Sequence, residues 1–297
     1  MVDRHRGTRI LVAEHAGVCY GVERALQLTY DAARDARQPV RTLGPLIHNP
    51  RVVAELAAEG VGTADAIEQA DGGTIVIRAH GVVPQAIEAA RARGLDVIDA
   101  TCPYVKKVHH AASKLAREGY QVIVVGESGH PEVEGILGHA GEGAVVVSCA
   151  HDLDGLELSR RVGVVVQTTQ TDERLGQIVA ALVSRVGDVK VINTICKATH
   201  ERQESAAALA SRVDAMIVIG GKNSGNTRRL AQICSERCEN THHIEDAAEL
   251  DTAWFGHAET IGVTAGASTP PAHIRQAIEA LLSINPGSSV EWDRDRA

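Results

Sequence analysis

One pattern occurs three times in this chain of 297 residues: an aliphatic, β-branched run leads into a cysteine, and a helix-like stretch follows it. The three copies are ILVAEHAGVCYGVERAL (10–26), LDVIDATCPYVKKVH (95–109) and VKVINTICKATHERQ (189–203). Their cysteines, Cys19, Cys102 and Cys196, are 83 and 94 residues apart, close to the length of one small α/β unit. Self-similarity at a nearly fixed period indicates a repeated architectural unit. The pattern therefore predicts three units, each delivering one thiol to a common point.

Short apolar runs alternate with helical stretches along the whole chain, which favours parallel βαβ construction. Residues 84–94 and 271–282 carry the i, i+3, i+4 apolar spacing of surface helices. The predicted strands are 9–15, 40–44, 74–80, 96–100, 121–127, 144–148, 162–168, 190–194, 215–221 and 260–266. We expect an α/β fold of three pseudo-threefold-related domains with parallel-type sheets around a shared site. The predicted boundaries are 20–101 for the first domain, 102–195 for the second, 196–285 plus 1–19 for the third, and 286–297 for a polar tail.

The three repeated cysteines are candidate metal ligands. Thiolates suit a soft metal or an iron–sulfur cluster, whereas structural zinc usually takes four protein ligands. Because no fourth cysteine repeats the pattern, we predict a 4Fe–4S cluster with three cysteine ligands and one open iron. The other cysteines receive structural interpretations. Cys149 follows a strand-like run and is expected in the core, while Cys234 and Cys238 lie four apart on a predicted helix. Zinc binding with the histidines that follow is the alternative there, and helical packing is favoured.

Composition limits the partners. The formal net charge is −8 and only seven residues are Phe, Trp or Tyr, so a nucleic-acid partner is disfavoured. No apolar run approaches the length of a membrane span, and the N-terminus has no signal-peptide pattern. We therefore expect a cytoplasmic protein with no membrane partner. We also expect it to be monomeric or weakly associating.

Six loops at predicted strand ends carry hydrogen-bonding side chains. Measured from the cysteines, His48, His130 and Asn226 lie 29, 28 and 30 residues on, and His80, Thr168 and Ser268 lie 61, 66 and 72 residues on. Ligands of parallel α/β sheets bind at the carboxyl ends of the strands, where helices begin. The set of His48, Asn49, His80, His130, Thr168, Thr169, Ser224, Asn226 and Ser268 therefore suits a polyanion such as a diphosphate. Glu132, with Thr168 beside it, is the predicted proton donor.

Two nucleotide-binding patterns are missing from the sequence. It has no G-x-x-x-x-G-K-[ST] loop, and no predicted strand is followed by G-x-G-x-x-G with an acidic residue about 20 positions later. Triphosphate hydrolysis and a dinucleotide-dependent dehydrogenase are therefore disfavoured.

Nine motifs together resemble the LytB/IspH family of 4-hydroxy-3-methylbut-2-enyl diphosphate reductases, over about residues 9–283. They are GVCYGVERA (17–25), HNPRVV (48–53), AHGV (79–82), DATCPYVKKVH (99–109), GHPEVEG (129–135), QTT (167–169), TICKAT (194–199), KNSGNTRRL (222–230) and TAGAS (264–268). In this combination and order they are highly specific, although none would be alone.

The resemblance implies three α/β domains around a central 4Fe–4S cluster on Cys19, Cys102 and Cys196. It implies reductive removal of a hydroxyl group from an allylic diphosphate, which gives isopentenyl and dimethylallyl diphosphates in the non-mevalonate isoprenoid pathway. The implied electron donor is ferredoxin or flavodoxin with its reductase. The implied catalytic residues are Glu132, Thr168 and His130, and the implied substrate contacts are His48, His80, His130, Thr168, Ser224, Gly225, Asn226 and Ser268.

This chain departs from the family pattern in two places. Gly225 stands where a second serine is common, so a glycine amide would replace one hydroxyl contact. Lys197, His200 and Glu201 follow the third cysteine in place of an aromatic and small polar residues. We expect Lys197 to point to solvent. Two alternatives stay open: a diverged paralogue that acts on a related allylic diphosphate, and a non-catalytic metal-binding protein, which the retention of Glu132 and Thr168 disfavours.

Overall fold

The computed structural model describes residues 7–35 and 38–293. Residues 1–6 and 294–297 lie outside that range. The first of these segments belongs to the predicted third domain and to the N-terminus that was searched for a signal peptide, and the second belongs to the predicted tail. The chain forms two compact units. Unit 1 contains the residues up to Cys19, the segment His48–Pro50 and the residues from Lys197 onward. Unit 2 contains Tyr20–Ile47 and Arg51–Cys196.

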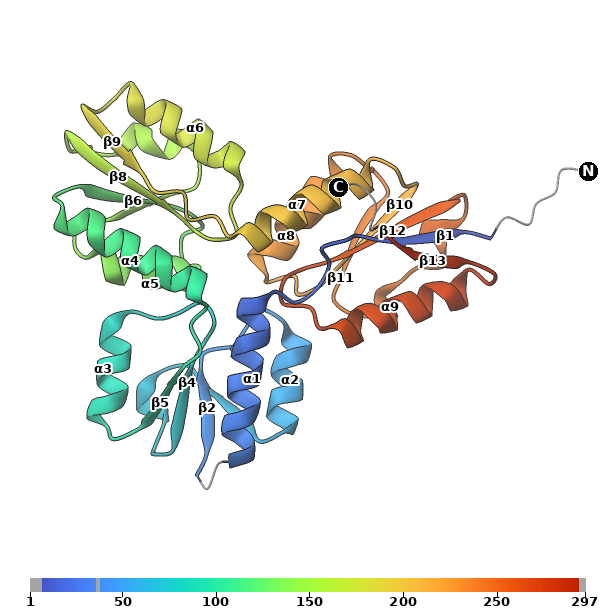
Figure 1. Ribbon diagram of the computed structural model, residues 1–297, viewed down its shortest axis with the longest axis horizontal. Helices are drawn as coiled ribbons and strands as arrows, with labels where there is room; N and C mark the ends of the chain where they lie inside the picture. The colour runs from blue at the N-terminus through green and yellow to red at the C-terminus, as the bar shows by residue number, and fades with distance from the viewer. Residues whose placement is uncertain (1–6, 36–37, 294–297) are drawn as a thin grey trace, which may run out of the picture. The chain divides into compact units, whose positions relative to one another are not determined.

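Unit 2 contains two parallel four-stranded sheets (Figure 1). The first has the order β3-β2-β4-β5, and its strands are β2 (Val40–Leu43), β3 (Val61–Ala64), β4 (Thr74–Ile77) and β5 (Asp96–Asp99). The second has the order β7-β6-β8-β9, with β6 (Gln121–Val125), β7 (Val145–Val147), β8 (Arg161–Val166) and β9 (Asp188–Val191). The helices are α1 (Tyr20–Asp35), α2 (Pro50–Ala58), α3 (Pro84–Ala92), α4 (Pro103–Arg117), α5 (Pro131–Ala140) and α6 (Asp172–Val183).

Unit 1 contains one parallel sheet with the order β11-β10-β12-β1-β13. Its strands are β1 (Arg9–Val12), β10 (Ala215–Ile219), β11 (Thr241–Ile244), β12 (Thr260–Ala265) and β13 (Ser289–Trp292), and its helices are α7 (Lys197–Ala210), α8 (Gly225–Ser235) and α9 (Pro271–Ile284). Without β13, the strand order repeats that of both sheets in unit 2. The prediction of three α/β units with parallel sheets is confirmed.

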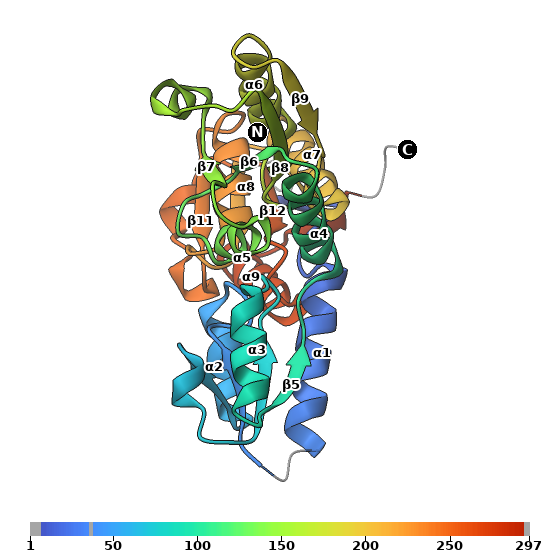
Figure 2. The same cartoon turned by 90° about the vertical axis from the view of Figure 1, so that its left-hand side faces the viewer.

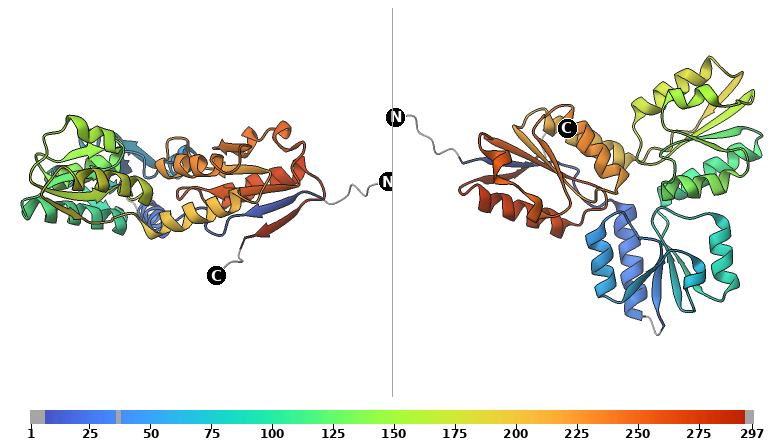
Figure 3. Two further views of the ribbon diagram at one scale, coloured as in Figure 1. Left: turned by 90° about the horizontal axis from the view of Figure 1, so that it is seen from above. Right: turned by 180° about the vertical axis from the view of Figure 1, so that it is seen from behind.

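Each sheet is covered by helices on both faces, which explains why central strands such as β4, β6 and β10 are apolar over most of their length. Successive side chains of a strand point to opposite faces, and β10 shows this clearly. Ile217 packs with α9, and Met216 and Val218 pack with α7 and α8. In Figure 3, right, the red helix α9 lies on one face of its sheet and the gold and orange helices α7 and α8 lie on the other.

The same layering recurs in unit 2. Helices α1 and α2 cover one face of the first sheet and α3 covers the other, which is turned toward the viewer in Figure 2. Helices α4 and α5 cover one face of the second sheet, and α6 covers its opposite face. The helices that follow the three cysteines are α1, α4 and α7. Each therefore shares a face of its sheet with the next helix along the chain, which is α2, α5 or α8 respectively.

All ten predicted strands overlap observed strands, but β3, β11 and β13 were not predicted. Strand β11 reads Thr-His-His-Ile and lacks an apolar run, and β3 is short and rich in small residues. Residues 289–292 of the predicted tail form strand β13, which pairs with β1 in parallel register from Arg9 and Ser289 to Val12 and Trp292. Its side chains are all exposed, so the sequence carried no burial pattern there.

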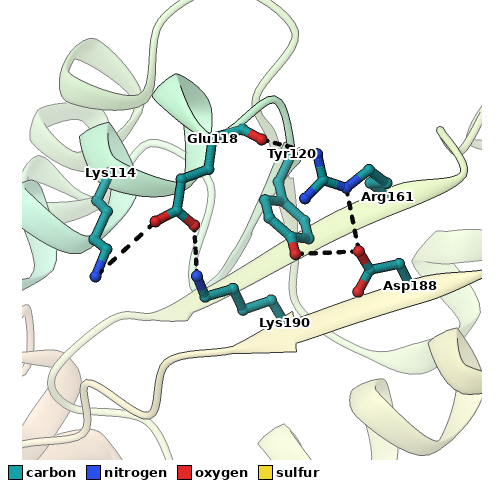
Figure 4. A network of polar contacts seen from close by, with 6 residues as sticks. All are labelled: Lys114, Glu118, Tyr120, Arg161, Asp188 and Lys190. Carbon is teal, nitrogen blue, oxygen red and sulfur yellow. Dashed lines mark hydrogen bonds and ion pairs between the residues drawn. The ribbon is translucent and has the colours of Figure 1, made fainter.

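Polar side chains anchor the edge strand β9 at its beginning (Figure 4). The network consists of Lys114, Glu118, Tyr120, Arg161, Asp188 and Lys190. The hydroxyl of Tyr120 and Nε of Arg161 both donate to Asp188 Oδ2 at 3.1 Å. Lys190 Nζ lies 2.5 Å from Oε2 of Glu118, the C-cap residue of α4. Single exposed pairs contribute only about 0–1 kcal/mol, but together these contacts hold the strand that leads to Cys196.

No helix within residues 7–35 and 38–293 combines the length and the apolar character needed to cross a membrane.

Candidate functional site

The three repeated cysteines occupy equivalent positions in the three sheets. Cys102 follows β5, Cys196 follows β9 and Cys19 follows β1, which are corresponding strands in the repeated order. Each cysteine amide donates to the carbonyl oxygen two residues beyond the end of the neighbouring strand. The acceptors are Ala79 at 2.9 Å from Cys102, Thr168 at 3.1 Å from Cys196 and Ala267 at 3.2 Å from Cys19. The repeat found in the sequence is therefore also a repeat of backbone geometry.

The local chemistry at these cysteines fits thiolate ligands. Helix α1 begins at Tyr20 and α7 at Lys197, each directly after its cysteine, and Cys102 is the N-cap of α4. A helix N-terminus favours negative charge at that place. Cys196 is buried, with only 8% of its surface exposed.

Two arginines that the sequence reasoning missed support the backbone before a cysteine. Arg202 on α7 is 7% exposed and donates to the carbonyl of Gly17, from Nε at 3.0 Å, and to that of Val18, from Nη2 at 3.0 Å. Arg24 on α1 donates to the carbonyl of Thr101 at 3.3 Å. Each lies in the helix after one cysteine and binds the backbone before another. A basic residue five or six positions after Cys19 and Cys196 was the available signal.

Glu132 and Thr168 form a buried acid site in unit 2. Glu132 lies in the first turn of α5 and is 2% exposed. The amide of Thr168 donates to Glu132 Oε1 at 2.7 Å, and its hydroxyl donates to Oε2 at 2.9 Å. Burial raises the pKa of Glu132 to about 7, against the two hydrogen bonds from Thr168, which lower it. Because the Thr168 carbonyl also accepts from Cys196, one residue links the acid to a cysteine.

Two predicted histidines lie close to this acid. His130 is the N-cap of α5, and its Nδ1 accepts from the backbone amide of Glu132 at 3.1 Å. That contact fixes the tautomer of His130, which must carry its proton on Nε2 when it is neutral. The rings of His80 and His130 meet edge to face with centroids 5.7 Å apart. Unit 2 therefore brings together Glu132, Thr168, His80 and His130.

The N-terminus of α8 in unit 1 has the features of an anion site. Ser224 caps the helix by accepting from the amide of Thr227 at 3.3 Å, and Gly225 begins it. Asn226 is 4% exposed, and neither its Nδ2 nor its Oδ1 has a hydrogen-bond partner within the described chain. A buried amide without partners costs about 1–3 kcal/mol. A ligand oxygen at this helix end could accept a hydrogen bond from Asn226 Nδ2.

His48 and Ser268 meet in the same unit. Ser268 Oγ donates to the carbonyl of His48 at 3.2 Å, and Asn49 Nδ2 donates to the carbonyl of Ser268 at 2.8 Å. A methyl group on Gly221 would lie 2.5 Å from the carbonyl oxygen of His48. These contacts explain why residues 48–50 belong to unit 1 although the flanking chain belongs to unit 2. His48 and Ser268 are therefore held together on one side of unit 1.

The remaining predictions about cysteines and Lys197 have mixed outcomes. Lys197 points to solvent as expected, with its side chain 80% exposed and 3.3 Å from Glu201. Cys234 and Cys238 pack in the core as favoured, but only Cys234 lies on a helix, because α8 ends at Ser235. Around Cys234 and Cys238, the described residues form no group of three His, Cys, Asp or Glu side chains that could hold a zinc ion, so the zinc alternative gains no support. The core placement of Cys149 is wrong: it is exposed and caps a short 3₁₀ helix through Asp152.

The LytB protein family matches residues 10–282. The chain is 48% identical over 278 residues to the 4-hydroxy-3-methylbut-2-enyl diphosphate reductase of Citrifermentans bemidjiense, covering 93% of this chain and 98% of that protein. It is 49% identical over 285 residues to the enzyme of the same name from Aquifex aeolicus, covering 95% and 98%.

Two solved structures are similar. One is of (E)-4-hydroxy-3-methyl-but-2-enyl diphosphate reductase, the terminal enzyme of the non-mevalonate pathway, with a TM-score of 0.70, 48% identity and coverage of 93% of this chain and 99% of that one. The other is of the E-1-hydroxy-2-methyl-but-2-enyl-4-diphosphate reductase from Plasmodium falciparum, with a TM-score of 0.90, 26% identity and coverage of 98% and 94%.

Proposed function

Because the chain belongs to the LytB family, we propose that it is the reductase that removes the hydroxyl group of 4-hydroxy-3-methylbut-2-enyl diphosphate. The observation that carries the proposal is the buried pair of Glu132 and Thr168. A carboxyl group with a pKa of about 7 holds a proton near neutral pH and can give it up within the same range. Thr168 places that acid one backbone hydrogen bond from Cys196.

We assign Cys19, Cys102 and Cys196 as the ligands of a 4Fe–4S cluster with one open iron. Their support is the common backbone geometry and the helix N-terminus that follows each thiol. When bound, such a cluster supplies electrons one at a time and a Lewis-acidic iron. An external donor, ferredoxin or flavodoxin with its reductase, would replace the electrons.

The assigned diphosphate contacts are polar donors at the strand ends of each unit. In unit 1 the assigned contacts are Ser224, the Gly225 amide, Asn226, His48 and Ser268, and in unit 2 they are His80, His130 and Thr168. The strongest support is the buried, unsatisfied amide of Asn226 at the first turn of α8. Backbone amides of a helix N-terminus bind phosphate oxygens well, and the Gly225 amide needs no side chain to do so.

The proton would travel from Glu132 through the hydroxyl of Thr168. A hydroxyl is both donor and acceptor, so a protonated Glu132 can donate to Thr168 Oγ1 while the Thr168 hydrogen turns toward the substrate. The allylic C–O bond breaks, one proton converts the leaving hydroxyl group to water, and two electrons with a second proton reduce the allylic fragment. Protonation at either end of that fragment gives isopentenyl or dimethylallyl diphosphate.

Anaerobic reconstitution with iron and sulfide, followed by turnover with a strong reductant, tests this function. We expect a brown protein that converts the hydroxymethylbutenyl diphosphate to the two products. A colourless protein that binds one zinc ion would contradict the cluster assignment. A brown protein that is inert toward this diphosphate but reduces a related allylic diphosphate would favour a diverged paralogue.

Asn226→Ala is expected to raise KM by about tenfold to 100-fold, because hydrogen bonds to a charged group contribute about 1.5–3 kcal/mol. The melting temperature should not fall, since the amide has no partner to lose within the described chain. Steady-state kinetics and thermal denaturation measure both effects. Gln232→Ala, at an exposed position of the same helix, is the matched control. A wild-type KM in Asn226→Ala would remove this residue from the diphosphate site.

A further inference from the structure

His109 lies on α4, seven residues after Cys102, and is 6% exposed. Its ring stacks on His139 of α5 with centroids 3.9 Å apart and an interplanar angle of 14°. Its Nε2 is buried and has no hydrogen-bond partner among the described residues. Burial, with a smaller effect from His139, lowers the pKa of His109 to about 3, so the ring is neutral. Packing, rather than hydrogen bonding at Nε2, therefore holds this edge of the ring.

The edge of this ring lies against two glycines. A methyl group on Gly81 would lie 2.6 Å from Cε1 of His109, and a methyl group on Gly135 would lie 3.1 Å from Nε2. Gly81 also has a φ of 73°, a conformation that favours glycine. The ring therefore leaves little or no room for a side chain at either glycine.

The two glycines belong to the elements that carry assigned site residues. Gly81 directly follows His80, and Gly135 lies one helical turn after Glu132 on α5. We infer that His109 is a positioning residue that sets the distance between the His80 loop and the first turn of α5. This inference rests on the proposed function. The edge-to-face contact between His80 and His130 depends on the same distance.

The consequence of losing this ring follows from close packing. Protein interiors respond to the loss of a few atoms by partial collapse around the void. In His109→Ala the loop and the helix would move toward each other, and displacing a reacting or binding group by 1 Å can cost about 100-fold in rate. Because His109 is not assigned to touch substrate, the loss would act through His80 and Glu132.

The first test is hydrogen–deuterium exchange of the reconstituted full-length protein. His109→Ala should exchange faster than wild type in residues 78–83 and 130–135. Leu115→Ala, which opens a cavity in the core on the same helix, controls for general destabilisation and should not accelerate these two segments selectively. Equal exchange in both variants would overturn the inference.

The second test is a comparison of kinetic constants below the melting temperature. We expect His109→Ala to lower kcat and raise KM together, with kcat/KM down by about 10-fold to 100-fold. Gly135→Ala, whose methyl group would press on Nε2, should change both constants in the same directions by less. His110→Ala, at an exposed neighbouring position, should leave both unchanged.

The two hypotheses can fail separately. A wild-type protein inert toward the diphosphate would refute the proposed function, and the exchange measurement would still decide the role of His109. An active wild type with unchanged exchange and kinetics in His109→Ala would refute only the positioning role.

Discussion

Glu132→Gln is expected to lower kcat by about 10²- to 10⁴-fold, the usual contribution of a positioned general acid. Glutamine keeps the length and shape of the side chain. It can accept from the Thr168 amide and donate to the Thr168 hydroxyl, but it has no proton to transfer. KM should change little, because the diphosphate contacts are assigned to other side chains. Steady-state kinetics of the reconstituted variant, with its iron content measured, provides the comparison.

The same substitution is expected to raise the free energy of unfolding above neutral pH. Such a gain would show that the lower kcat does not come from loss of the fold. The pKa of Glu132 is raised from 4.5 to about 7 in the folded protein. The folded state therefore bears no penalty below about pH 4.5, an increasing penalty up to about pH 7, and a constant one above it. We expect Glu132→Gln to be more stable than wild type at pH 8, by up to about 3 kcal/mol, and equally stable at pH 4.

Glu134→Gln is the matched control for both measurements, because Glu134 lies in the same turn of α5 and is exposed. Its kcat and its stability should be those of wild type at either pH. Full activity in Glu132→Gln would show that another group supplies the proton.

Cys102→Ser is expected to abolish turnover and to remove most of the cluster absorbance after anaerobic reconstitution. A serine hydroxyl is less acidic than a thiol, and its oxygen is a harder ligand than sulfur, so serine binds iron–sulfur clusters poorly. The fold should persist, because the Cys102 amide, which donates to Ala79, is unchanged. Iron and sulfide analysis, the visible spectrum and turnover report the effect, and circular dichroism reports the fold.

Cys149→Ser controls for the loss of any thiol, since Cys149 is exposed and its capping role with Asp152 suits serine equally well. It should keep wild-type iron, sulfide and turnover. A full cluster complement and normal turnover in Cys102→Ser would refute the assignment of this cysteine.

The sequence predicted the repeated α/β construction because its signals are local. Central strands such as β10 are apolar over their full length, and each cysteine lies between a strand pattern and a helix pattern. Edge strands gave weaker signals. Strand β11 contains two histidines, and the His242 ring stacks on Trp254 with centroids 3.8 Å apart, a contact that no local pattern contains. The domain boundaries stay a prediction.

The site residues stay a prediction, but the structure corrects the register in which their loops were aligned. Counting from the cysteines aligned His80, Thr168 and Ser268, whereas the cysteine amides bind Ala79, Thr168 and Ala267. Thr169 therefore corresponds to His80 and Ser268. The separations of 61, 66 and 72 residues could not reveal this correspondence. An inserted residue changes a separation along the chain but leaves the hydrogen bonds between neighbouring strand ends unchanged. Buried Arg202 escaped notice for a related reason, since its partners Gly17 and Val18 lie far away in the chain.

The placement of β1 has a consequence for biosynthesis. Cys19 is the first cysteine to leave the ribosome, yet the strands beside β1 are β12 and β13, and the carbonyl that receives the Cys19 amide belongs to Ala267. The sheets that lead to Cys102 and Cys196 contain only residues between 40 and 191, so they can form during synthesis, as early domains generally do. A nascent chain that stops before β12 lacks the backbone partner of Cys19. Of the three repeated cysteines, the first to be synthesised is therefore the last to gain its backbone hydrogen bond.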